Sequence, residues 1–173
     1  MDHELVALSE AIRDAAVSPC RRRRLLIATA ESCTGGWAAQ VITHTAGSST
    51  WFERGFITYS NDAKIELLDV NTVSLTNFGA VSTEVAAEMA VGALQHSRAD
   101  LSVSITGIAG PGGGSPDKPV GTVCFAWCVR DTDGVILSPS CQRRLFDGDR
   151  EMIRRTAVIH ALKGLAALAN SVP

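Results

Sequence analysis

Residues 25–44 of this 173-residue chain read LLIATAESCTGGWAAQVITH. The first part, Leu25–Ala30, is an apolar run of the length typical of a buried strand. Residues 30–36, AESCTGG, combine small hydroxyl residues with a glycine pair, as expected for a tight turn. Residues 37–44 then carry apolar side chains at helical spacing. This stretch therefore predicts a strand, a turn and a helix in succession, the unit from which α/β folds are built.

The rest of the chain continues the alternation of helix and strand patterns. Apolar residues at spacings of three and four predict helices at residues 3–17, 61–68, 82–97 and 149–170. Runs rich in β-branched and apolar residues predict strands at residues 56–60, 101–106, 121–129 and 135–146, the last interrupted near Pro139. The order of these elements predicts a single-domain α/β fold over residues 1–173. It is expected to be a three-layer sandwich, with a mixed sheet and helices on both faces.

The composition is that of an ordinary globular protein. Hydrophobic residues make up 46% of the chain and charged residues 20%, and the formal net charge is −2. This balance argues against disorder and against a nucleic-acid-binding surface. The basic run Arg21–Arg24 is interpreted as a solvated turn rather than a phosphate-binding patch. The N-terminus is charged and amphipathic, and no apolar run approaches the ~20 residues that span a bilayer. We therefore expect no membrane association and a cytoplasmic location.

The cysteines and histidines indicate neither disulfides nor a metal site. The number of cysteines is odd, and no pair has CxxC or zinc-ligand spacing. Cys124 and Cys128 lie four residues apart in an expected strand, which places them on one face as small buried hydrophobic residues. The four histidines are scattered and lack HExxH spacing. We therefore expect no metal and no cofactor.

Two glycine-bearing turns each follow a predicted strand: residues 30–36, and residues 107–117 with the sequence GIAGPGGGSPD. Turns at the carboxyl ends of strands line the ligand crevice of open α/β sheets, and a neighbouring helix N-terminus offers free N–H groups to an anion. The motifs GxGxxG, GxxxxGK[ST] and GxSxG are absent from the chain. Dinucleotide enzymes, P-loop NTPases and α/β-hydrolases are therefore disfavoured. The turns still suit a phosphate or a developing oxyanion.

Since no histidine is suitably placed, a serine nucleophile would need a lysine whose pKa is lowered by burial. The chain has three lysines. Lys163 lies late in the last helix, and Lys118 forms a formal SxxK with Ser115 in a glycine-rich segment that cannot form the required helical turn. Lys64 begins a helix just after a strand, from where it could reach the crevice. Its position alone is still more typical of an exposed helix lysine.

Five ordered blocks of the sequence resemble the CinA C-terminal domain family. They are AESCTGG (30–36), GFITYSNDAK (55–64), GAVSTEVAAEMAVGA (79–93), SITGIAGPGGGSPDKPVGTV (104–123) and FDGDREMIR (146–154). The resemblance extends from about residue 5 to residue 168. The free-standing members of this family are understood to be nicotinamide-nucleotide amidohydrolases. They hydrolyse the carboxamide of nicotinamide mononucleotide to nicotinate mononucleotide and ammonia, with a serine and a lysine and without a metal.

The resemblance implies roles for individual residues. Ser32 of AESCTGG would be the nucleophile, Lys64 of YSNDAK its base, and Tyr59 a partner for the lysine or for the leaving group. Water would release the acyl-enzyme. Cys33 and Ser48 remain alternatives to Ser32 as the nucleophile. For Cys33, nothing in the sequence nearby would favour the thiolate.

The same resemblance implies a set of substrate-binding positions. Backbone N–H groups from Cys33 to Gly36 would hold the oxyanion of the tetrahedral intermediate. The substrate phosphate would meet a glycine-rich turn, a helix N-terminus and Arg150. The substrate-binding residues implied in this way are Cys33, Thr34, Gly35, Gly36, Ser48, Thr106, Gly107, Gly110 and Arg150.

Two other functions stay open at the level of sequence. One is a module that senses nucleotides or binds a partner, with little or no turnover. The other is hydrolysis of a related amide or nucleotide, because the sequence does not reveal the shape of the base pocket. The expected partner is a small-molecule substrate rather than a nucleic acid, and the apolar helices are compatible with a homo-oligomer.

Overall fold

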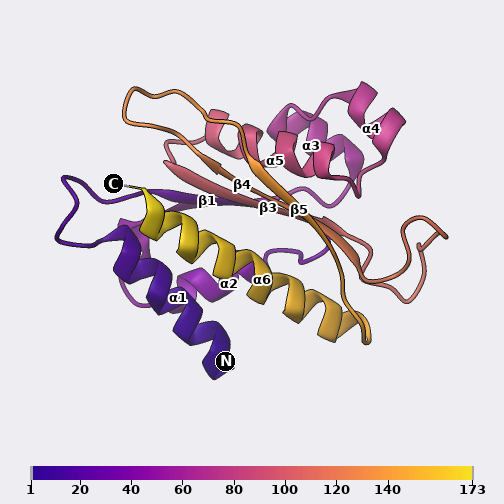
Figure 1. Ribbon diagram of the computed structural model, residues 1–173, viewed down its shortest axis with the longest axis horizontal. Coiled ribbons are helices and arrows are strands. Elements are labelled where there is room, and N and C mark those ends of the chain that lie inside the picture. The colour runs from indigo at the N-terminus through magenta and orange to yellow at the C-terminus, as the bar shows by residue number, and fades with distance from the viewer. Residues whose placement is uncertain (1, 173) are drawn as a thin grey trace.

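The computed structural model describes residues 2–172, and it has three layers, with one sheet between two layers of helices (Figure 1). One helical layer consists of α1 (His3–Ala16), α2 (Trp37–His44) and α6 (Arg150–Ser171). The other consists of α3 (Asn61–Leu68), α4 (Thr72–Phe78) and α5 (Thr83–Gln95). The strands are β1 (Ile27–Glu31), β2 (Phe52–Ile57), β3 (Leu101–Gly107), β4 (Thr122–Val129) and β5 (Ser140–Leu145). The predicted α/β sandwich is confirmed.

The order of strands in the sheet determines where a site can form. The order is β2-β1-β3-β4-β5, and β2, β1 and β3 run parallel to one another while β4 and β5 pair antiparallel. The three parallel strands therefore end at the same edge of the sheet. After β1 the chain continues into α2, and after β2 it continues into α3 in the opposite layer. Such a divergence opens a crevice at the carboxyl ends of the strands.

Alternating side chains of the strands form two hydrophobic cores. Leu101, Val103 and Ile105 of β3 pack towards α1, α2 and α6. On the opposite face, small residues of the sheet contact the closely packed helix α5: Ala28, Ala30, Cys124, Ala126 and Cys128. Cys124 and Cys128 are thus buried on one face, as predicted. Strands covered on both faces have few polar side chains to expose, which explains why β1, β3 and β4 are recognisable as apolar runs.

The sequence predicts some boundaries less well. The expected strand at residues 56–60 begins earlier, at Phe52, and ends at Ile57, because β2 pairs along β1 from Ile27 onwards. The helix α4 was not predicted, and it has no buried residue, so no apolar stripe marks it. In the basic run, Arg21 donates to the carbonyl oxygens of Ala15 and Val172, and Arg23 forms a bidentate ion pair with Asp100. The run therefore ties a turn to the body of the protein rather than only facing solvent.

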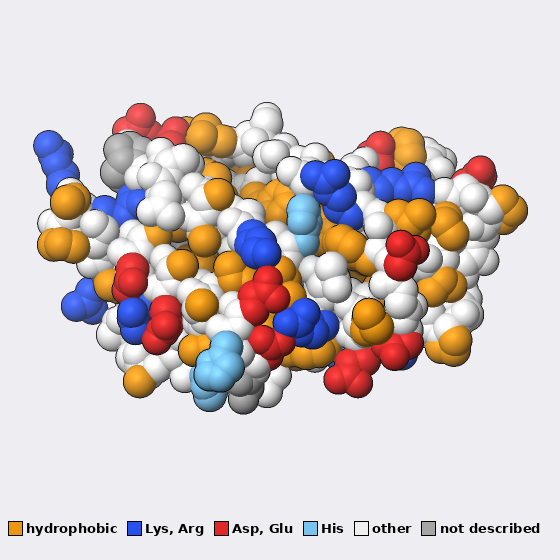
Figure 2. Space-filling model, turned by 60° about the horizontal axis from the view of Figure 1, so that its bottom comes forward, with side chains coloured by type: hydrophobic (Ala, Val, Ile, Leu, Met, Phe, Trp, Pro, Cys, Tyr) orange, Lys and Arg blue, Asp and Glu red, His pale blue; other side chains and the backbone are white. Residues whose placement is uncertain are grey.

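The outer face of α1 and α6 carries charges of both signs. Figure 2 shows Lys and Arg side chains next to Asp and Glu side chains on this face, with hydrophobic side chains scattered between them. Arg155 pairs there with Asp2 and Glu4, and Lys163 pairs with Glu4. Neighbouring opposite charges cancel at a distance, so this face presents no continuous basic field. Within residues 2–172, no helix combines the length and apolarity that crossing a bilayer requires.

Candidate active site

Ser32 lies at the carboxyl edge of the sheet, directly after β1. Its backbone N–H donates to the carbonyl oxygen of Ile105 on β3, so the neighbouring strand fixes its position. The next strand, β2, ends alongside, where the N–H of Thr58 donates to the carbonyl oxygen of Glu31. The chain then enters α3, whose N-cap is Ser60, and this short connection places Lys64 beside Ser32. Parallel pairing thus joins two segments that lie 32 residues apart.

The two side chains are in hydrogen-bond contact. Lys64 Nζ lies 3.1 Å from Ser32 Oγ, and it also donates to the carbonyl oxygen of Thr58 at 2.8 Å and, more weakly, to that of Ser60 at 3.4 Å. Lys64 is 1% exposed and Ser32 is 9% exposed. Burial penalises the charged form of the amine and lowers the pKa of Lys64 below its ordinary value. Lys64 is therefore a buried lysine, not the exposed one that position alone favoured.

A pocket of about 230 Å³ opens at Ser32. No carboxylate is among the residues that line it, and its two basic side chains are those of Lys64 and Arg150. Its remaining lining residues are Cys33, Tyr59, Asn61, Ala80, Val81, Thr106, Gly107 and Ala109. Asn61, Ala80, Val81 and Ala109 were not predicted as site residues. A guanidinium without a neighbouring carboxylate in the pocket suits an anionic ligand.

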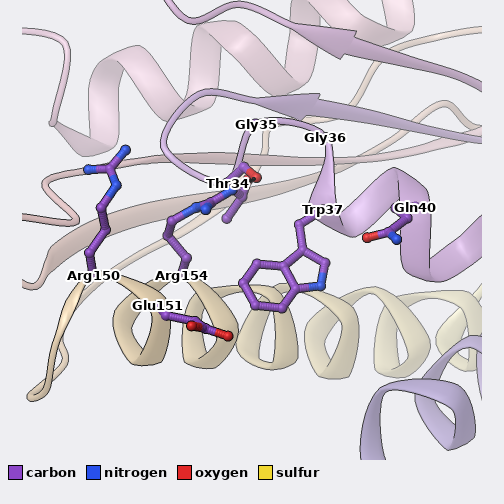
Figure 3. A pocket seen from close by; sticks show the side chains of 8 residues that line it. All are labelled: Thr34, Gly35, Gly36, Trp37, Gln40, Arg150, Glu151 and Arg154. Atoms are coloured by element: carbon purple, nitrogen blue, oxygen red, sulfur yellow. Dashed lines mark hydrogen bonds between the residues drawn. The ribbon is translucent and has the colours of Figure 1, made fainter. Parts of the chain in front are cut away.

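Arg150 lines both this pocket and a second, larger one of about 600 Å³. It donates to the hydroxyl of Tyr59 at 3.1 Å and to the carbonyl oxygen of Gly110 at 2.6 Å. Figure 3 shows Arg150 and Arg154 extending from successive turns of α6, with the end of Arg154 beside Thr34. The other residues that line the second pocket are Gly35, Gly36, Trp37, Gln40 and Glu151.

Most of the predicted site residues meet at this edge, although some differ from their expected roles. Tyr59 is 62% exposed, and its hydroxyl contacts Arg150 rather than Lys64. Thr106 lines the pocket, but its hydroxyl is used in a hydrogen bond to the carbonyl oxygen of Ala80. Cys33 also lines the pocket, while burial raises the pKa of its thiol to about 12. A thiol with so high a pKa is protonated at neutral pH, which counts against Cys33 as the nucleophile.

The predicted site residue Ser48 lies away from both pockets. It begins a 3₁₀ turn, Ser48–Thr50, between α2 and β2. Trp51, directly after this turn, accepts a hydrogen bond from the N–H of Ile27, at the amino end of β1. Since Ser32 follows the carboxyl end of the same strand, Ser48 and Ser32 lie at opposite edges of the sheet.

Glu31 is a functional candidate that sequence reasoning missed. Its side chain is fully buried and accepts hydrogen bonds from the hydroxyl of Thr34 and from the backbone N–H groups of Gly36, Ala38 and Ala39. The carboxylate thus caps the N-terminus of α2 from inside the protein, and both Gly35 and Gly36 have positive φ values in the turn around it. Its place directly before Ser32, inside a helix-initiating turn, was the signal available in the sequence.

Residues 9–169 match the family model of the CinA C-terminal domain. The chain belongs to this family. The prediction made from the five sequence blocks is therefore confirmed. Among residues 2–172, no group of three or more His, Cys, Asp or Glu side chains is arranged to hold a metal ion.

Curated relatives cover nearly the whole chain. The nicotinamide-nucleotide amidohydrolase PncC of Escherichia coli K12 is 51% identical over 164 residues, which cover 95% of this chain and 94% of that protein. PncC of Pseudomonas putida is 51% identical over 150 residues, or 87% of this chain and 90% of that protein.

Solved structures of similar proteins share the fold. The competence/damage inducible protein CihA from Agrobacterium tumefaciens has a TM-score of 0.85 at 46% identity, covering 97% of both chains. The competence damage-inducible protein A from Klebsiella pneumoniae has a TM-score of 0.86 at 33% identity, covering 96% of this chain and 98% of that one.

Proposed function

We propose that this protein hydrolyses the carboxamide of nicotinamide mononucleotide, giving nicotinate mononucleotide and ammonia. The observation that carries the proposal is the contact of 3.1 Å between Lys64 Nζ and Ser32 Oγ in a buried pocket without carboxylates. Two relatives that are 51% identical are named nicotinamide-nucleotide amidohydrolases, which supports the choice of substrate.

The hydrogen bonds of Lys64 suit a neutral amine acting as a base. A neutral amine has two N–H groups and one lone pair. The carbonyl oxygens of Thr58 and Ser60 are within reach of the two N–H groups, which leaves the lone pair for the hydroxyl proton of Ser32. Because the amine is buried and has no carboxylate partner, its charged form is disfavoured. Lys64 is thus prepared to accept a proton from Ser32.

The reaction then proceeds by acylation and deacylation. Ser32 Oγ attacks the carboxamide carbon as its proton passes to Lys64 Nζ, and a tetrahedral intermediate forms. Lys64 returns this proton to the amide nitrogen, the C–N bond breaks, and ammonia leaves. Water attacks the ester formed on Ser32, gives one proton to Lys64, and releases the carboxylate as Ser32 recovers its proton. The balance is one amide and one water consumed, one acid and one ammonia produced.

The oxyanion of the intermediate needs hydrogen-bond donors. The N–H of Gly35 donates to the carbonyl oxygen of Ser32 and that of Gly36 donates to Glu31, so both are occupied. The N–H groups of Cys33 and Thr34 have no acceptor on another residue of the described chain. We therefore narrow the proposed donors from the four residues 33–36 to Cys33 and Thr34.

The two neighbouring pockets suit the two ends of a nucleotide. The pocket at Ser32 has a volume of about 230 Å³, below the roughly 300 Å³ at which small-molecule sites usually begin. We propose that it holds the nicotinamide ring and that the ribose and phosphate extend past Arg150 into the larger pocket. Arg150 lines both pockets and can exchange its present neutral partners, Tyr59 and Gly110, for the phosphate.

The test is ammonia release from nicotinamide mononucleotide by the wild-type protein and by Ser32→Ala and Lys64→Ala. Each substitution is expected to lower kcat by at least ~10³-fold, because nucleophile and base act as a unit. Matched controls are Ser115→Ala and Lys118→Ala, because these two residues form an SxxK pattern outside the proposed site. Lys118 Nζ donates to the carbonyl oxygen of Phe78 instead, so both controls should keep wild-type turnover.

The competing functions predict other results. Tight binding of the nucleotide in calorimetry with no ammonia released over hours would identify a sensing module. Turnover of another pyridine nucleotide or of an aliphatic amide, in preference to nicotinamide mononucleotide, would keep the dyad and replace the substrate. Full activity of both Ser32→Ala and Lys64→Ala would overturn the mechanism.

A further inference from the structure

Arg154 makes two hydrogen bonds to the turn that carries Ser32. From the second turn of α6, its Nε donates to the carbonyl oxygen of Cys33 at 3.1 Å, and its Nη2 donates to that of Thr34 at 2.9 Å. Its guanidinium also lies over the indole of Trp37, with 5.4 Å between Cζ and the ring centroid. Figure 3 shows Arg154 beside Thr34 and Trp37 at the wall of the larger pocket. A planar guanidinium can hold two successive carbonyl groups at once, which a lysine cannot do.

These contacts determine the direction of a neighbouring N–H group. A peptide unit is planar and trans, so its C=O and N–H bonds point in opposite directions. Holding the carbonyl of Cys33 therefore fixes the N–H of Thr34, which belongs to the same peptide unit. This N–H has no acceptor among the residues that the structure describes, whereas the next one, of Gly35, donates to the carbonyl oxygen of Ser32.

We infer that Arg154 is a positioning residue for catalysis: it orients the N–H of Thr34 towards the oxyanion that forms when Ser32 attacks its substrate. Arg154 does not touch the reacting atoms and acts through the backbone of the turn. The second proposed donor, the N–H of Cys33, is oriented independently of Arg154, because the carbonyl of its peptide unit accepts the hydrogen bond from Gly35. The inference rests on the proposed amidohydrolase function.

The alternative role for Arg154 is direct binding of the substrate phosphate, since it lines the larger pocket. Its hydrogen bonds argue against this, because two of its three nitrogens are already used on backbone carbonyls. The two roles have different kinetic consequences. Loss of an oriented oxyanion donor lowers kcat, while loss of a phosphate contact made equally in ground and transition states raises KM.

The experiment compares Arg154→Ala and Arg154→Lys with Arg155→Ala as the control. Arg155 is the next residue of α6, and its guanidinium pairs with Asp2 and Glu4 on the outer face. Nicotinamide mononucleotide is the substrate for kcat and KM, and calorimetry measures the affinity of each variant for nicotinate mononucleotide. Because the product lacks the tetrahedral carbon of the intermediate, its affinity reports on the folded binding site rather than on the transition state.

We expect Arg154→Ala to lower kcat ~10²-fold, the effect of losing or misplacing one oxyanion donor, with KM and product affinity within about threefold of wild type. Arg154→Lys should stay at least tenfold below wild type, and added guanidinium ion should partly restore Arg154→Ala. Arg155→Ala should match wild type. A raised KM with unchanged kcat, or wild-type kinetics of both Arg154 variants, would overturn the inference. Lack of turnover by the wild-type protein would instead remove the proposed function, and this inference with it.

Discussion

At the scale of single residues, the protonation state of Lys64 controls the proposed reaction. The base must be neutral to accept the proton of Ser32, so kcat/KM should fall tenfold per pH unit below the pKa of Lys64 in the free enzyme. Burial lowers this pKa, and the decline should therefore begin at a pH below the ordinary lysine value of ~10.4. The measurement is the dependence of kcat/KM on pH with nicotinamide mononucleotide. A tenfold rise in kcat/KM per pH unit that continues up to about pH 10.4, with no plateau below it, would contradict a lowered pKa.

Stability measurements provide an independent test of the same pKa. In the unfolded chain Lys64 has an ordinary pKa, which is higher than its folded value. Between these two pKa values the unfolded state binds more protons, so raising the pH stabilises the fold. Below the folded pKa, the cost of burying the amine is present in full. Between neutral pH and pH ~10, the free energy of unfolding of the wild type should therefore rise relative to that of Lys64→Met. The expected rise is about 1.4 kcal/mol for each unit by which folding lowers the pKa, and urea unfolding measures it. A difference that does not vary with pH would refute this.

The thiol of Cys33 should be inert although it lies next to the nucleophile. Its pKa of about 12 keeps it protonated at neutral pH, and the side chain is buried. Iodoacetamide should therefore label the exposed Cys20 and Cys141 in the folded protein, leave Cys33 unmodified, and preserve activity. Mass spectrometry of the labelled peptides gives the result. Inactivation that follows labelling of Cys33 would show that this cysteine is reactive.

At the scale of elements, the N-terminus of α2 depends on the buried carboxylate of Glu31. In Glu31→Gln one side-chain oxygen becomes an NH₂ group, which cannot accept from the N–H groups that now meet the carboxylate. Leaving a buried group unsatisfied costs about 1–3 kcal/mol, or roughly 2–9 °C in Tm for a domain of this size. The same change should lower kcat because Ser32 follows Glu31 directly. Glu66→Gln, at an exposed position of α3, is the control and should leave both Tm and kcat unchanged.

Sequence patterns predicted the elements well where burial was extreme. The strands β1, β3 and β4 are almost fully buried, and α5 and α6 have long buried faces, so their apolar patterns are strong. The short α4 has no buried residue and left no pattern. In the site, Ser32 and Lys64 were found through motifs, whereas Arg154 was missed because its contacts depend on how α6 packs against the turn after β1.

At the scale of the whole molecule, the parallel topology of the sheet decides which segments meet at the site. Because β1 and β2 are parallel, both end at the same edge of the sheet, and Lys64, which follows β2, therefore lies beside Ser32, which follows β1. The turn between α2 and β2, which contains Ser48, lies at the opposite edge. This distinction cannot be made from spacing alone. It needs the pairing of β1 with β2, a contact between distant parts of the sequence.

Close packing of the two helical layers gives a last prediction. A Cβ at Gly92 of α5 would lie 2.1 Å from the carbonyl oxygen of Leu68, and one at Gly164 of α6 would lie 2.3 Å from the indole of Trp127. Both Gly→Ala variants should therefore lose stability, Gly164→Ala by about 1–3 kcal/mol and Gly92→Ala by more, because its clash is with backbone.

Leu68 ends α3 one turn after Lys64, so only Gly92→Ala displaces the proposed base. It should lower kcat at least tenfold, whereas Gly164→Ala should stay within about threefold of wild type, since Gly164 lies ten residues, or roughly 15 Å along α6, from Arg154. Equal losses of kcat in the two variants would show that general loosening of the fold, not the position of α3, limits turnover.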